Sequence, residues 1–174
     1  MKLHYGRILK LSLLSFLMFI FLLNTQAAAA QTPKLSMDFN KLIYEQNLSL
    51  TIYYVSPFKL TRAPIKTKDL ENGWFEYKII VQNYRLENYM NLLNSLNKAK
   101  FTPVKKKSYE NLRIYYVFET KKKKLLSVGM WGNDNSMFIN GYEVVENKTL
   151  YDIVMPFLPK DAANELQKYL RESK

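Results

Sequence analysis

Residues 112–145 decide the fold, and they read LRIYYVFE, TKKKK, LLSVGMW, GNDNS, MFI, NG and YEVV in succession. Short apolar runs rich in β-branched and aromatic residues, separated by turn residues, are typical of strands. Asn140-Gly141 between two such runs is the strongest short-range signal for a β-hairpin. The stretch therefore predicts consecutive antiparallel strands at 112–119, 125–131, 137–139 and 142–145.

The strand at 112–119 has two faces. Successive side chains of a strand point to opposite sides, so one face carries Leu112, Ile114, Tyr116 and Phe118. Tyr115 points the other way, as does Tyr53 in an earlier strand of the same kind. Exposed tyrosines are favoured at binding interfaces, but a long connection packed on these two rings would bury them. The sequence leaves both interpretations open.

The flanking sequence extends the pattern on both sides. Apolar periodicities of two and of 3.6 residues separate the expected strands from the expected helices. The strands lie at Leu48–Val55 and Trp74–Gln82, and the helices at Tyr84–Ala99, Leu150–Leu158 and Lys160–Glu172. The connection between the two strands contains Pro57, Pro64 and Gly73, and its length is typical of functional or mobile loops.

The order of elements is β-β-α-β-β-β-β-α-α, with hairpin-linked strands and helices set apart. Such an order predicts an α+β fold, an antiparallel sheet of about five to six strands with helices packed on one face. The expected core contains Ile79, Val81, Leu93, Ile114, Tyr116, Phe118, Ile139 and Phe157.

Residues 1–30 follow the order of a secretory signal peptide. Basic residues come first, an apolar run covers Leu11–Leu23, and Ala27–Ala30 offer small side chains for cleavage after Ala29 or Ala30. The run is shorter than the roughly 20 apolar residues of a spanning helix, and no cysteine is present to carry a lipid anchor. We expect an exported protein, periplasmic or extracellular, with a flexible leader at 31–41 and a single α+β domain at 42–174.

The amino-acid composition excludes several kinds of catalytic and metal site. The chain has no cysteine, and its single histidine, His4, lies in the expected signal peptide. A mature chain without either residue has no Ser–His or Cys–His nucleophilic pair and no zinc site of the usual kind. Gly132–Ser136 approaches the spacing of a calcium loop but lacks its distal glutamate, so a hairpin turn is favoured. We expect no catalytic residue, no metal and no cofactor.

The basic residues are concentrated between Lys98 and Lys124, where ten bases face two acids. Clustered lysines bind polyanions by releasing counterions. Lysines that flank an aggregation-prone strand also protect it from self-association, and the two lysine runs lie at opposite ends of the strand at 112–119. The candidate binding residues are Lys105, Lys106, Lys107, Arg113, Tyr115, Lys121, Lys122, Lys123 and Lys124.

Three function classes follow from these observations. The first is a non-enzymatic protein that binds a protein partner, as an inhibitor, an immunity-like protein or an envelope accessory factor. The second is a protein that binds an envelope polyanion or an anionic membrane surface through its lysine clusters; no specific nucleic acid is expected. The third is a hydrolase that uses a pair of carboxylates, drawn from Glu76, Glu119, Glu143, Glu146 and Asp152.

Overall fold

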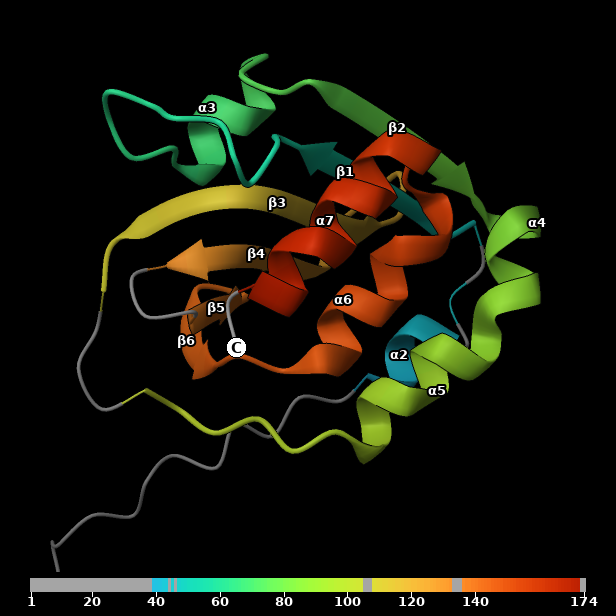
Figure 1. The fold of residues 1–174 in the computed structure, drawn as a ribbon. Coiled ribbons are helices and arrows are strands. Elements are labelled where there is room, and N and C mark those ends of the chain that lie inside the picture. Colours follow the sequence, from blue (N-terminus) through green and yellow to red (C-terminus); the bar gives the residue numbers. More distant parts are fainter. Residues whose placement is uncertain (1–38, 44, 46, 105–107, 133–135, 173–174) are drawn as a thin grey trace, which may run out of the picture. The chain divides into compact units, whose positions relative to one another are not determined.

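A computed structural model describes residues 39–43, 45, 47–104, 108–132 and 136–172. Its centre is a six-stranded antiparallel sheet with the order β2-β1-β3-β4-β5-β6 (Figure 1). The strands are β1 (Ser49–Tyr54), β2 (Tyr77–Gln82), β3 (Glu110–Glu119), β4 (Lys124–Gly132), β5 (Ser136–Ile139) and β6 (Tyr142–Val145). The predicted α+β class and antiparallel sheet are confirmed.

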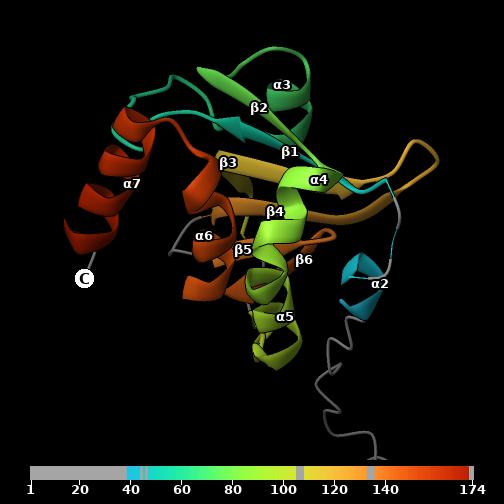
Figure 2. The ribbon, with the colours of Figure 1, turned by 90° about the vertical axis from the view of Figure 1, so that its right-hand side faces the viewer.

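Helices contribute to the main core from one side of the sheet. They are α2 (Asn40–Ile43), α4 (Asn83–Leu86), α5 (Met90–Lys98), α6 (Lys148–Val154) and α7 (Lys160–Glu172), with single 3₁₀ turns at Glu87–Tyr89 and Met155–Phe157. A further short helix, α3 (Thr67–Glu71), belongs to a second, smaller cluster. In the turned view of Figure 2, α3 and α7 lie on opposite sides of strands β1 and β2.

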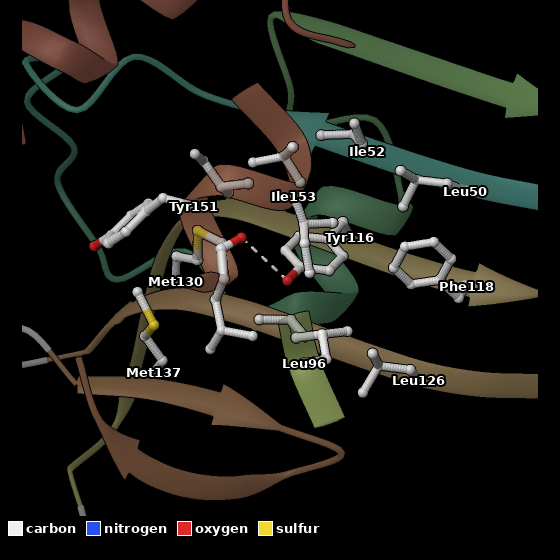
Figure 3. Packing of buried hydrophobic residues seen from close by; sticks show 14 of the residues in the cluster. Leu50, Ile52, Leu96, Tyr116, Phe118, Leu126, Met130, Met137, Tyr151 and Ile153 are labelled. Atoms are coloured by element: carbon white, nitrogen blue, oxygen red, sulfur yellow. Dashed lines mark hydrogen bonds between the residues drawn. The ribbon is translucent and has the colours of Figure 1, made fainter. Parts of the chain in front are cut away.

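The main core packs one sheet face against these helices (Figure 3). Tyr116 lies at its centre, fully buried, and its hydroxyl donates a hydrogen bond of 3.2 Å to the carbonyl oxygen of Leu150 in α6. This bond satisfies the polar end of a ring that otherwise contributes apolar area. Of the eight residues predicted for the core, six are buried, and Ile79 and Phe157 are half-buried.

The hairpin signal at Asn140-Gly141 is confirmed. Both residues have positive φ, 50° and 80°, as a type I′ turn requires. Ile139 and Tyr142 face each other on β5 and β6 directly beside the turn. The predicted terminal helix Lys160–Glu172 coincides with α7.

The alternation predicted for β3 is wrong at Leu112. The pairing of β3 with β4 shifts register between Glu110 and Ile114. As a result Leu112 lies in the second cluster together with Tyr115, whereas Ile114 lies in the main core. An irregularity of this kind interrupts the two-residue period, so the two sides of it are out of phase.

The start of β2 also differs from the prediction. β2 begins at Tyr77 rather than Trp74, because the N–H of Trp74 is bonded to the carbonyl of Asp69 in α3 and not to a neighbouring strand. Phe39, within the expected leader, is buried and its ring contacts Phe101. The expected signal peptide and residues 31–38 lie outside the described residues. Among the described helices, none combines the length and apolarity needed to cross a membrane.

Candidate functional site in a polar hollow beside helix α3

The second face of the sheet is covered by the long connection between β1 and β2. The ring of Tyr53 stacks on Tyr115 at 5.9 Å and contacts Phe75 at 5.6 Å. Ile65 and Leu70 from the connection complete the cluster. Of the two interpretations of the tyrosine pair, the packed one therefore holds, and Tyr115 is only 4% exposed.

Short-range and long-range hydrogen bonds hold α3 against β3. The carboxylate of Asp69 accepts the N–H of Lys66 at 2.8 Å, which satisfies a free donor at the start of the helix. Glu110 on β3 accepts both the N–H and the hydroxyl of Thr67, at 2.9 and 3.1 Å. Leu70 of α3 is fully buried in the second apolar cluster and holds the helix on the sheet. α3 is thus fixed as a wall beside the sheet.

Between α3 and strands β3, β4 and β5 lies a cavity of about 550 Å³, here called the hollow. Its volume falls within the range of roughly 300–1,000 Å³ typical of ligand sites. It is lined by Lys66, Thr67, Lys68, Glu71, Glu110, Tyr115, Lys124, Ser127, Gly129, Phe138 and Gly141. Apolar groups come from the strands, and most of the charged groups come from α3 and the residue before it.

Gly129, which lines the hollow, leaves room for the side chain of Leu112. It lies on β4 directly between Tyr115 of β3 and Phe138 of β5. A Cβ atom on Gly129 would stand 2.9 Å from the Cδ2 atom of Leu112. Glycine at this position therefore allows the Leu112 side chain to pack directly on the strand.

Glu71 joins the two predicted binding residues of the hollow. Its Oε1 atom accepts the ammonium of Lys124 at 2.6 Å and the hydroxyl of Tyr115 at 3.4 Å. The hydrogen bond to Glu71 raises the pKa of Lys124, and burial raises the pKa of Tyr115 to about 12. At neutral pH the hollow therefore contains protonated Tyr115 and charged Lys124 as donors.

The remaining lysines of the predicted site lie elsewhere. Lys121, Lys122 and Lys123 occupy the exposed turn between β3 and β4, where Lys123 is 3.9 Å from a carboxylate oxygen of Glu45. Lys105–Lys107 lie outside the described residues. The structure thus brings Tyr115 and Lys124 together at the hollow, while Lys121–Lys123 lie in the adjacent turn.

Arg113 does not line the hollow; its guanidinium contacts the connection between β1 and β2. It donates to the side chain of Asn111 at 2.9 Å and to the backbone carbonyls of Leu112 and Lys59 at 3.1 and 3.4 Å. Burial lowers the pKa of its guanidinium. Its contacts indicate a structural role in holding the connection on β3.

The sequence prediction missed most of the hollow. Lys66, Lys68 and Glu71 lie in the connection, which was expected to be irregular, and Glu110 and Phe138 come from strands distant in sequence. The only advance signal was the unusual length of the connection, since long loops often carry function.

Each carboxylate considered for catalysis has its own separate contact. Glu143 is buried and accepts the hydroxyls of Ser108 and Ser136 and, at 2.7 Å, the N–H of Ser108. The others contact Lys59 (Glu76), Thr51 (Glu119), Tyr151 (Glu146) and Lys148 (Asp152). Within the described ranges no three acidic, histidine or cysteine side chains gather as metal ligands, and the middle of Gly132–Ser136 lies outside those ranges.

The comparisons with known proteins find no matching family model, no similar curated protein and no similar solved structure.

Proposed function

We propose that this protein is exported and acts by binding a protein partner, one segment of which occupies the hollow beside α3. The observation that carries the proposal is the composition of the hollow. Tyr115, Gly129 and Phe138 form an apolar base, and charged side chains of both signs surround it. An apolar centre with a polar rim is the usual anatomy of a protein–protein interface.

The lining favours a protein segment over a small cofactor. Cofactor sites are lined mainly by apolar and aromatic groups with few polar ones, whereas lysines and acids make up much of this rim. Lys66 and Lys68 are exposed, and the ion pair between Lys124 and Glu71 is also exposed, with side-chain exposures of 56% and 33%. Exposed pairs contribute about 0–1 kcal/mol, so a partner's charged groups can replace them at small cost.

The balance of charges also indicates the partner's chemistry. Three lysines and two glutamates line the hollow, Lys66, Lys68 and Lys124 against Glu71 and Glu110. Lys124 and Glu71 form an ion pair, so Lys66 and Lys68 outweigh Glu110 and the rim carries a net charge of +1 (3 − 2). A partner segment with an acidic side chain, flanked by an apolar residue that fits against Phe138, would complement both features.

A second candidate function rests on the lysine turn between β3 and β4. The side chains of Lys121–Lys124 are all exposed, so their positive charge is available to a polyanion. Two of the four are close to acids, Lys123 to Glu45 and Lys124 to Glu71. This partial neutralisation makes the turn the weaker of the two candidates.

Site-specific photo-crosslinking in the producing organism tests the proposal. A photoreactive phenylalanine analogue replaces Lys68 in the full chain, and the same replacement of the exposed Lys100 on another surface is the matched control. We expect a protein-sized adduct from position 68 that survives high salt during capture and is absent from position 100. Equal labelling at both positions would contradict a protein partner at the hollow. So would a crosslink to an anionic polymer that forms at low salt and is absent at high salt.

A further inference from the structure

We propose that the loop from Pro57 to Pro64 docks the protein on an anionic lipid bilayer, with Leu60 and Phe58 entering the boundary between headgroups and acyl chains. This surface is separate from the hollow, and the proposal does not depend on the protein partner proposed above.

Two large exposed apolar side chains lie on this loop. Leu60 is 98% exposed and Phe58 is 45% exposed. Glu76, just before β2, ties the loop to the neighbouring chain, because it accepts the N–H of Ser56 at 3.0 Å and the ammonium of Lys59 at 2.8 Å. Trp74, two residues before Glu76, is itself 67% exposed. Large apolar side chains that occur together on a surface, rather than singly, mark interaction sites.

The loop is held in place by specific contacts. The N–H of Phe58 is bonded to the hydroxyl of Ser56 at 3.3 Å, and the ring of Phe58 contacts that of Tyr169 at 6.1 Å. Arg113 donates to the carbonyl oxygen of Lys59 at 3.4 Å. Leu60 is therefore presented by a fixed backbone, and a prearranged contact loses less conformational entropy on binding than a loose one.

The charge of the segment suits an anionic surface. Residues 56–64 contain two basic residues, Lys59 and Arg62, and no acid, and Lys59 is paired with Glu76 at 2.8 Å. Along the tip, Phe58 and Leu60 alternate with Lys59 and Arg62, and Lys168 of α7 lies 5.3 Å from the ring of Phe58. Apolar groups with basic residues beside them are the arrangement that binds the plane of an anionic membrane.

The small number of apolar groups favours a bilayer over a protein as the occupant. A stable protein interface takes about 20–30 residues on each side, whereas the loop offers only Phe58 and Leu60 as large exposed apolar side chains. A membrane surface needs only a few inserted side chains when cations near the headgroups assist.

Vesicle sedimentation tests the proposal with residues 31–174, which contain every residue of both apolar clusters and exclude the apolar segment at 11–23. The vesicles contain phosphatidylcholine with about one-third phosphatidylglycerol, and pure phosphatidylcholine is the neutral comparison. We expect Leu60→Ser to weaken partitioning about tenfold and Arg62→Gln about fivefold. Val145→Ser, at an exposed apolar position on β6, is the matched control and should bind like the unchanged protein.

A fluorescence measurement shows whether the loop itself enters the bilayer. The double variant Leu60→Trp/Trp74→Phe carries its only exposed indole at the loop tip, while Trp131 remains buried as a constant background. We expect a blue shift and quenching by brominated lipid when anionic vesicles are added. The proposal would be overturned if the tryptophan emission did not shift, or if Leu60→Ser and Val145→Ser bound the vesicles equally well. It would also be overturned if vesicle binding were lost only after neutralisation of Lys121–Lys124. Loss of the Lys68 crosslink in Leu60→Ser, with vesicle binding unchanged, would assign the loop to the protein partner instead.

Discussion

Replacement of Leu70 by alanine tests whether α3 is a fixed wall of the hollow. Leu70 is fully buried in the second cluster, beside residues of the connection and of β3. Leucine-to-alanine changes at such sites cost about 2–5 kcal/mol, depending on how far the surroundings collapse. α3 has only five residues, so it can settle into the vacated space, and we expect a loss of about 2–3 kcal/mol in the free energy of unfolding.

The chain offers a matched control ten residues earlier. Leu60→Ala is the same chemical change at a side chain that is 98% exposed, and surface substitutions of this kind usually change stability by less than about 0.5 kcal/mol. Urea unfolding followed by tryptophan fluorescence measures both variants. With a slope of about 1.5 kcal/mol per molar urea, Leu70→Ala should lower the midpoint by about 1.3–2 M. A shift no larger than that of Leu60→Ala would refute the packing of α3 and with it the hollow.

Three further predictions concern the base of the hollow and the lysine turn. Gly129→Val should cost about 1–3 kcal/mol in urea unfolding, because its Cβ would stand 2.9 Å from Leu112; an unchanged midpoint would contradict the close packing there. The pKa of Tyr115 is raised in the folded state to about 12 from 10, so its contribution to stability is complete below pH 10 and is lost as the pH rises towards 12. Tyr115→Phe should therefore flatten the decline of stability with pH in that window, and an unaltered pH profile would be the contrary result. Replacement of Lys121–Lys124 by glutamine should increase light scattering on refolding; a soluble variant that has lost affinity for an anionic polymer would favour the polyanion candidate instead.

Local signals in the sequence determined the fold class. Asn140-Gly141 adopts the positive φ angles that a type I′ turn needs, and these depend on the two residues themselves. The helix Lys160–Glu172 followed from its own apolar spacing. The cap of α6 is equally local, since the side chain of Asn147 accepts the N–H of Thr149 two residues on. Turns and helices that depend on residues close together in the sequence could therefore be predicted.

The candidate site depended on contacts between segments far apart in the chain. The irregular pairing of β3 with β4 places Leu112 beside Tyr115, and the apolar pattern cannot reveal it, because leucine suits either face of a buried sheet. Glu71 meets Lys124 across 53 positions of sequence and Thr67 meets Glu110 across 43. Such pairs depend on where the long connection folds back on the sheet. Only the tertiary structure decided this, because burial of Ile65 and Leu70 against distant strands fixes the path of the connection.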